Sequence, residues 1–480
     1  MGKWTKFLMA AVLAAVGMAG SVGATPSVRD VIAQTDAIAM PDWQLPDIDR
    51  SLVAPGLRLW VLNEARLPTV ELFFLFPHGT FADADTQLGR TELMAAAWRA
   101  GGTVAHSPEA FAQALERRAI AISVDPKPEY TLVTLSCLKP DLPVALDLFK
   151  EWFLHPRFDA DRFDLVKRQM AQELREIADY PERLAAYVYP QLVYGPRNKW
   201  GRMLRLRDIE SVSRQAVQSA YGQMISAGPV LVGATGDVTA TDVRGFVADL
   251  WKDKSLPLAS SPAFVPMARK AWPVGVTLIP KAGDQSTVLV GHLGERRTNP
   301  DKFALLLANY MIGGDAFNSV LGSELRVTRG LVYGIYSSYG IETDYGIFRI
   351  YGKTSAGKTE EVLDFIRKGV ADVVSGKSVT VPALELAKRA ILSSLLFSNE
   401  RKGDLLTTLM TFDHYGYSPT YLETFVTEIK AVTIEDIRRV SRLYFYPDRF
   451  TVLVVGPQNL SGSLGVWTPS QIVPAEALLD

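Results

Sequence analysis

The sequence is poor in cysteine, and beyond its first residues it has no long apolar run. The single cysteine, Cys137, excludes an internal disulfide. It lies in the strand-like stretch 130–138, where we expect a small core residue and not a nucleophile. No stretch after residue 24 is long and apolar enough to span a membrane.

Histidine is also scarce, and its placement argues against a zinc site. No histidine has another three or four positions further on, so no pair could grip zinc from one face of a helix. A Gly-x-Ser-x-Gly elbow is absent too, which argues against a serine hydrolase. We expect each histidine to be a turn or surface residue; the five are His78, His106, His155, His292 and His414.

An excess of either charge is lacking as well, since 51 basic side chains stand against 52 acidic ones in 480 residues. Such a chain has no basic footprint of the kind that nucleic-acid binding requires. The length is too great for one hydrophobic core and predicts two or more domains.

The first residues have the pattern of a secretory signal. Two lysines precede an apolar run that ends near Gly20, and the small residues Val22 and Ala24 fit the −3 and −1 positions of a cleavage site. We therefore expect residues 1–24 to be removed and the mature chain to be periplasmic or secreted. Losing both lysines would move the formal net charge from −1 to −3. The alternative is an anchor helix, but the run is short for a membrane span.

The chain repeats one order of predicted elements. The strands and helices expected within 69–250 appear again in the same order after residue 276. The ends of the two series match at an offset of 220 residues, so the strand that ends at Gly236 corresponds to the one that ends at Gly456. A repeat of this length indicates a duplicated domain. Strands are predicted at 70–76, 119–124, 130–138, 229–236, 286–293, 331–339 and 345–351, and helices at 87–99, from Pro108, and at 142–153, 160–178, 301–311, 318–328, 359–375 and 381–398.

Hairpins followed by helices indicate layered α+β domains. Between the halves, segment 251–275 contains several prolines and serines and is expected to be an extended linker. We predict an N-terminal domain over 45–250 and a C-terminal domain over 276–470. Each should be an antiparallel β-sheet with helices packed mainly on one side.

Several short motifs, in their order and spacing, carry a family resemblance over nearly the whole mature chain. With its two similar halves, the sequence resembles the M16 peptidases, which include pitrilysin, insulin-degrading enzyme and the mitochondrial processing peptidases. The motifs are Gly79-Thr-Phe-Ala-Asp83, Leu88-Gly89, Gly101-Gly-Thr103, Asn198-Lys-Trp-Gly-Arg202, Gly236-Asp237-Val238 and Glu324-Leu-Arg-Val-Thr-Arg-Gly-Leu-Val-Tyr333.

The resemblance breaks at the metal site. Active family members carry His-x-x-Glu-His on the first long helix, where two imidazoles hold zinc and the glutamate activates water. Anchored on Gly89, these positions are Glu92, Ala95 and Ala96 here, so the helix has neither imidazole nor base.

Glu173 matches the position of the third zinc ligand, because 76 residues separate it from Ala96. Two carboxylates alone are a poor zinc site. We therefore expect Glu173 to form an ordinary salt bridge, and we expect no cofactor in this chain.

The second half keeps residues that the resemblance assigns to substrate. Arg326 and Tyr333 stand in the family context Arg-x-x-x-Gly-Leu-x-Tyr, and a guanidinium and a phenol suit a peptide carbonyl and its developing oxyanion. Gly313 and Gly314 would let the backbone approach a substrate closely. The hairpin 331–351 could offer an edge for a peptide strand. The alternative is that Arg326 is a helix-surface charge and Tyr333 a buried strand aromatic.

These residues imply a zinc-free, peptide-binding subunit of an exported zinc peptidase. It would pair with a homologous M16 subunit that carries His-x-x-Glu-His and the zinc, and its substrate would be a peptide or an unfolded polypeptide. Two other functions stay open, a peptide-binding or chaperone-like module without a peptidase partner and a structural scaffold. An active zinc enzyme is the least favoured.

Overall fold

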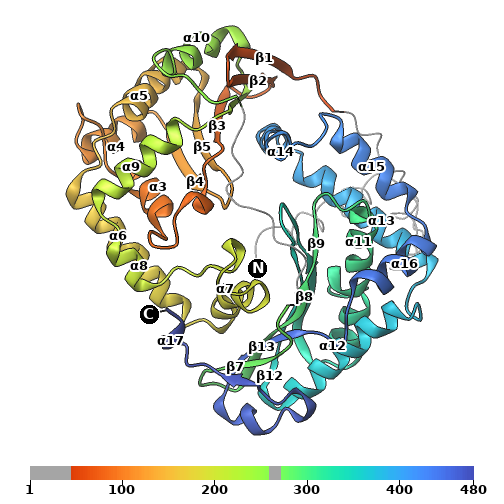
Figure 1. Ribbon diagram of the computed structural model, residues 1–480. Helices are drawn as coiled ribbons and strands as arrows, with labels where there is room; N and C mark the ends of the chain where they lie inside the picture. The colour runs from red at the N-terminus through yellow and green to blue at the C-terminus, as the bar shows by residue number, and fades with distance from the viewer. Residues whose placement is uncertain (1–44, 259–271, 480) are drawn as a thin grey trace, which may run out of the picture. The chain divides into compact units, whose positions relative to one another are not determined.

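A computed structural model describes residues 45–258 and 272–479 of the chain (Figure 1). The expected signal peptide, residues 1–24, lies outside the described residues, and so does the middle of the expected linker. Within the described ranges, no helix combines the length and the apolar character needed to cross a bilayer.

Two six-stranded sheets form the framework. The first has the order β1 (Asp49–Ala54), β2 (Leu57–Asn63), β6 (Val230–Gly236), β3 (Thr69–Phe76), β5 (Thr131–Leu138), β4 (Ala121–Pro126). The second has the order β14 (Gln471–Ile472), β7 (Gly275–Pro280), β13 (Thr451–Gly456), β8 (Gln285–Leu293), β12 (Ile347–Ser355), β10 (Val332–Tyr339). From β2 and β7 onward the two orders correspond strand by strand. The predicted pair of similar α+β domains is confirmed.

The sheets are mixed, so the prediction of purely antiparallel sheets was wrong in this detail. β2 runs parallel to β6, and β7 runs parallel to β13. In each half the last long strand returns after a long helical crossover and enters the sheet beside the first long strand. A crossover of that length can place two strands parallel, which a tight hairpin cannot.

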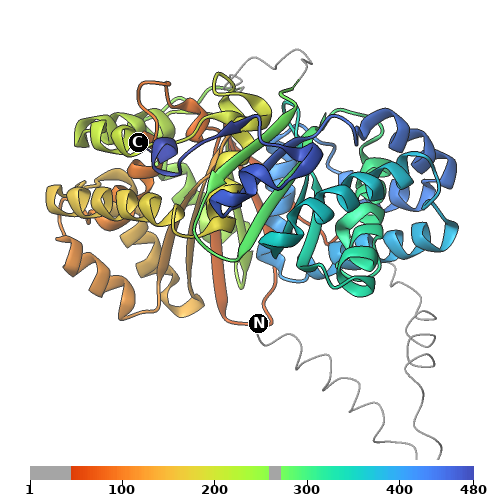
Figure 2. The same ribbon diagram turned by 90° about the horizontal axis from the view of Figure 1, so that it is seen from below.

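Helices of the first half cover one face of its sheet, as Figure 2 shows for the orange to yellow-green helices. Their apolar sides join the strands in one core, which includes Leu72 and Phe74 of β3, Leu93 of the first long helix and Phe149. The helices are α3 (Arg90–Ala100), α4 (Pro108–Glu116), α5 (Leu142–Leu154), α6 (Ala160–Ile177), α8 (Leu206–Ser211), α9 (Arg214–Ile225) and α10 (Ala240–Leu250). As predicted, a helix begins at Pro108, where the Ser107 side chain accepts a hydrogen bond from the Ala110 amide at 3.2 Å.

The second half repeats this helical layer. Its helices are α11 (Lys302–Asn309), two short π-helices (Tyr310–Gly314 and Gly322–Thr328), α12 (Thr359–Val374), α13 (Val381–Ser398), α15 (Tyr421–Ala431) and α16 (Ile434–Tyr444). The last helix, α17 (Glu476–Leu479), lies instead beside the first half, where Leu479 joins the core (Figure 1). A two-residue parallel pair, β9 (Glu295–Arg296) with β11 (Ile341–Glu342), stands beside the second sheet.

One helix from each half packs on the sheet of the other half. Helix α7 (Pro181–Tyr194) buries Leu184, Val188 and Tyr189 against β7, β8 and β13 of the second sheet (Figure 1). Helix α14 (Lys402–His414) lies on β6 and β3 of the first sheet, where Gly233 leaves room for Met410. The local helices leave one face of each sheet uncovered, and a helix from the other half covers part of that face.

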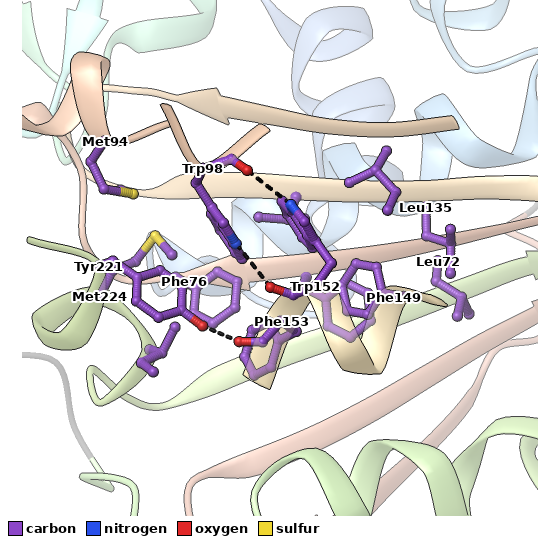
Figure 3. Close-up of a cluster of buried hydrophobic side chains, with 14 of the residues drawn as sticks. Leu72, Phe76, Met94, Trp98, Leu135, Phe149, Trp152, Phe153, Tyr221 and Met224 are labelled. Atoms are coloured by element: carbon purple, nitrogen blue, oxygen red, sulfur yellow. Dashed lines mark hydrogen bonds between the residues drawn. The ribbon is translucent and has the colours of Figure 1, made fainter. Parts of the chain in front are cut away.

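The core of the first half is centred on two stacked tryptophans (Figure 3). The rings of Trp98, on α3, and Trp152, on α5, lie 3.9 Å apart and nearly parallel, at 2°. Each indole N–H donates to the other residue's carbonyl oxygen, at 3.3 Å from Trp98 and 2.9 Å from Trp152. This reciprocal contact satisfies both buried donors and locks α3 to α5.

Replacing Tyr189 with alanine should destabilise the protein by about 3–5 kcal/mol. The ring is fully buried, and its hydroxyl donates to the Thr451 carbonyl oxygen at 2.9 Å, so the change leaves a cavity and an unpaired acceptor at the exchanged helix. Urea denaturation followed by circular dichroism measures the effect. The control is Tyr180→Ala, at the exposed start of the same helix, expected to change stability by no more than about 0.5 kcal/mol. If the two substitutions lowered the stability equally, the packing of α7 against the second sheet would be contradicted.

Candidate functional site

A buried aspartate sets the start of α3. The Asp83 carboxylate accepts hydrogen bonds from the Thr91 amide at 3.0 Å, the Thr91 hydroxyl at 2.6 Å and the Arg90 guanidinium at 3.3 Å. Gly89 precedes the helix with φ 83°, a left-handed conformation that glycine adopts without strain. The helix begins at Arg90, three residues later than predicted, because residues 85–88 form turns before it.

The three positions that the resemblance assigns to the first helix fall on α3 as predicted from the spacing. Glu92 and Ala96 are partly exposed, whereas Ala95 is buried and packs in the core. One carboxylate and two methyl groups cannot supply the imidazoles that zinc requires, so these residues do not fit the metal. In residues 45–258 and 272–479, no three His, Cys, Asp or Glu side chains are grouped so that they could hold a metal ion.

Glu92 is the unusual group at this position. Its Oε2 atom is buried and has no hydrogen-bond partner among the described residues. Burial raises the pKa of Glu92 to about 7, the negative charge of Asp83 adds to the rise, and Arg202 opposes it. The Glu92 carboxyl group thus lies in surroundings that disfavour its unpaired negative charge.

Glu173 lies exposed on α6 and forms no ion pair with any described residue. The expected salt bridge was therefore wrong. The physical reason is position, since no basic side chain of the described part of the chain comes within ion-pairing distance of Glu173.

The expectation for the histidines was wrong at one position. His292 lies in the middle of the second sheet, on β8, and is fully buried, where its ring faces the Leu293 carbonyl oxygen and the Tyr446 amide. Strand β8 is buried along its whole length from Ser286 to Leu293, and polar contacts to the ring make His292 compatible with the core.

A β-bulge brings Tyr333 to the surface of the second half. Val332 pairs with Thr354 and Gly334 pairs with Lys353, so Tyr333 is the extra residue of β10. Both Val332 and Ile335 are buried although they are three positions apart, which places the two residues between them on the opposite face. Tyr333 is 68% exposed, so the alternative of a buried strand aromatic was wrong.

Arg326 lies on the π-helix that leads into β10. Its guanidinium stacks over the ring of Phe317, 4.3 Å from the centroid, and it makes no hydrogen bond or ion pair with the described residues. The neighbouring Arg329 is instead engaged, with the Glu324 carboxylate at 2.7 Å. The Leu331 amide donates to the Leu325 carbonyl oxygen at 2.8 Å and fixes the π-helix to the start of the strand.

The two glycines have different surroundings. Gly313 is buried, and a Cβ there would come within 2.8 Å of the Ser337 hydroxyl oxygen, so the close approach that it permits is to β10. Gly314 is exposed. Both end the π-helix Tyr310–Gly314, and such helices are frequent at functional sites.

Two family models match the sequence. The model described as "Insulinase (Peptidase family M16)" matches residues 61–193, and the one described as "Peptidase M16 inactive domain" matches residues 211–391. The chain belongs to the M16 family. The resemblance drawn from the short motifs is thereby confirmed.

Curated M16 relatives align over most of the chain. An uncharacterised zinc protease of Mycobacterium tuberculosis is 24% identical over 361 residues, which cover 74% of this chain and 81% of that protein. A non-peptidase homologue of Helicobacter pylori is 22% identical over 401 residues, covering 80% of this chain and 91% of that protein.

Solved structures show the same fold. A peptidase M16 inactive domain from Pseudomonas fluorescens superposes with a TM-score of 0.74 at 22% identity and covers 86% of this chain and 98% of that one. A protease from Helicobacter pylori gives a TM-score of 0.74 at 16% identity, covering 86% and 100%.

Removing the charge of Glu92 should make stability less dependent on pH. The folded protein holds the Glu92 proton more tightly than the unfolded chain does, so the unfolding free energy falls as the pH rises from about 4.5 to about 7. Glu92→Gln cannot ionise, and relative to the unsubstituted chain it should gain roughly 1–3 kcal/mol between pH 4.5 and pH 8.

Urea denaturation at the two pH values measures this difference. Glu173→Gln is the matched control, because that carboxylate is exposed and forms no ion pair with the described residues, and the change should alter stability by no more than about 0.5 kcal/mol. A Glu92→Gln effect that does not change with pH would contradict the buried, uncompensated carboxylate.

Proposed function

We propose that this chain is the non-catalytic, peptide-binding subunit of an exported M16 zinc peptidase heterodimer. Its partner would be a homologue with an intact His-x-x-Glu-His helix, and the zinc would belong to that partner. In the pair, this chain supplies Arg326 and Tyr333 to the bound peptide.

The observation that carries the proposal is the contrast between the two halves. In the first half, Ala95 and Ala96 stand where a metal site needs a base and an imidazole. In the second half, Arg326 and Tyr333 are free of hydrogen-bond and ion-pair partners in the described structure, and a bulge holds Tyr333 at the surface. Tyrosine and arginine are enriched among the residues that dominate binding energy at interfaces.

The chemistry of the two side chains fits a scissile peptide. A phenol and a guanidinium donate hydrogen bonds to a peptide carbonyl oxygen, and the contacts strengthen as negative charge develops on that oxygen. Zinc in the partner would supply the activated water. The names of two similar proteins, a non-peptidase homologue and an M16 inactive domain, support a role without catalysis in this chain.

Two alternatives predict different behaviour. A peptide-binding or chaperone-like module would bind peptides with no peptidase partner, and a scaffold would bind none. The exposed Tyr333 and the half-buried Arg326, which has no hydrogen-bond or ion-pair partner among the described residues, favour the two peptide-binding roles over the scaffold.

The partner model is tested by co-expressing the chain with an exported homologue that carries His-x-x-Glu-His. We expect a complex in gel filtration, peptidase activity in the complex, and neither activity nor stoichiometric zinc in the isolated chain. Zinc at one equivalent in the isolated chain, or peptide hydrolysis by it, would contradict the proposal.

Arg326→Gln and Tyr333→Phe should each lower kcat/KM of the complex by about tenfold or more, because a donor to the reacting carbonyl is lost. Arg329→Gln is the matched control, since that guanidinium is occupied by Glu324 and should leave turnover unchanged. Gel filtration checks that each variant still assembles. Equal effects of the three changes would count against a direct role for Arg326 and Tyr333.

A further inference from the structure

The exposed face of β10 carries a second tyrosine beyond Tyr333. Tyr336 is 49% exposed on the same face, and it pairs directly across the strands with Tyr351 of β12, which is half-buried beside α7. Gly334 has no side chain between the two exposed tyrosines, and the Tyr336 ring lies 3.2 Å from where its Cβ would stand. Tyr333, Tyr336 and Tyr351 form what we name the tyrosine strip.

An arginine stands at each end of this strip. Arg326 lies on the π-helix joined to the start of β10, at the Tyr333 end. Arg349 of β12 pairs across the strands with Ser338, at the other end, and donates to the Ser338 hydroxyl oxygen at 3.1 Å. Neither guanidinium forms an ion pair with a carboxylate of the described chain.

Three acidic side chains of the neighbouring elements each have a basic partner. The pairs are Glu324 with Arg329 at 2.7 Å, Glu182 with Lys353, and Asp344 with Arg296 at 3.4 Å. Asp315, near Phe317, has none among the described residues and accepts hydrogen bonds from the Phe317 and Asn318 amides instead.

We propose that this face selects acidic peptides: an extended segment with an acidic side chain on each side of a short apolar stretch. The proposal rests on the peptide-binding function above and adds the substrate class. The strand between Tyr333 and Ser338 spans roughly 17 Å at about 3.3 Å per residue, the length of about five extended residues. The apolar stretch lies on the tyrosine strip, and the carboxylates meet Arg326 and Arg349.

The physical basis is charge complementarity between the two arginines and the acidic side chains of the peptide, together with apolar contact on the tyrosine strip. Arginine and carboxylate form charge-assisted, bidentate hydrogen bonds. Tyrosine presents a large, rigid contact area at a low entropic cost, and tyrosine and arginine are enriched among the residues that dominate binding energy.

The experiment compares two labelled peptides with the same apolar centre, one flanked by glutamate and one by glutamine, both amidated at the C-terminus. Fluorescence anisotropy with the intact mature chain gives both Kd values. We expect the glutamate peptide to bind about fivefold tighter or more at low salt, and the ratio to fall as salt is added. Arg349→Gln should reduce the ratio about threefold while the Kd of the glutamine peptide stays unchanged.

Tyr336→Ala should weaken both peptides alike. Arg442→Gln, an exposed arginine on α16, is the control and should leave the ratio as it is. Circular dichroism confirms that each variant is folded.

The outcomes separate this inference from the function on which it rests. Equal Kd values for the two peptides, or a preference that appears only with a free C-terminal carboxylate, would overturn the acidic selection. If both then still weaken in Arg326→Gln or Tyr333→Ala, the peptide-binding function stands alone. Failure of the chain to bind either peptide would overturn both.

Discussion

The exchange of one helix between the two halves is the contact on which the rest of this structure depends. A sheet has two faces, and the local helices of each half cover only one of them. Helix α7 covers part of the second sheet, and α14 covers part of the first. Burial of these apolar faces is the largest favourable term available to hold the halves together, so neither sheet is complete without the other half.

Polar contacts between the two halves accompany this apolar packing. Arg58 of the first sheet holds Asp413 of α14 through two hydrogen bonds, at 2.9 and 2.6 Å. At the tip of the β4–β5 hairpin, the buried pair of Glu129 and Arg297 joins the halves at 3.3 Å. A buried pair is weak evidence for stability, but either charge left buried without its partner would destabilise the fold. The exchanged helices therefore bury apolar surface between the halves, and the ion pairs add polar contacts at two further places.

Helix α7 also lies near both candidate regions, the Glu92 region of the first half and the tyrosine strip of the second. Tyr187 of α7 is close enough to Glu92 for that carboxylate to help raise the pKa of the tyrosine, after the larger effect of burial. Further along, α7 packs beside Tyr351 of the second sheet. Helix α3 is held by Asp83 at its start and by the Trp98–Trp152 stack on its buried side. Of the three positions that correspond to the family's metal site, Glu92 and Ala96 are partly exposed, whereas Ala95 is buried.

The sequence by itself determined the duplication, the main strands and helices of both halves, and the loss of the imidazoles. Each of these depends on local periodicity, on turn residues or on the identity of single side chains, which a linear pattern contains. The helix exchange, the parallel pairs β2–β6 and β7–β13, and the buried place of His292 depend on contacts between residues far apart in the chain, and only the tertiary structure decided them. Tyr333 lies between these cases. The family motif predicted Tyr333 as a substrate-binding residue. The burial of Val332 and Ile335 and the pairing with β12 created the bulge that turned it outward. The same bulge set Tyr333 on one face with Tyr336, a residue that the motif did not include.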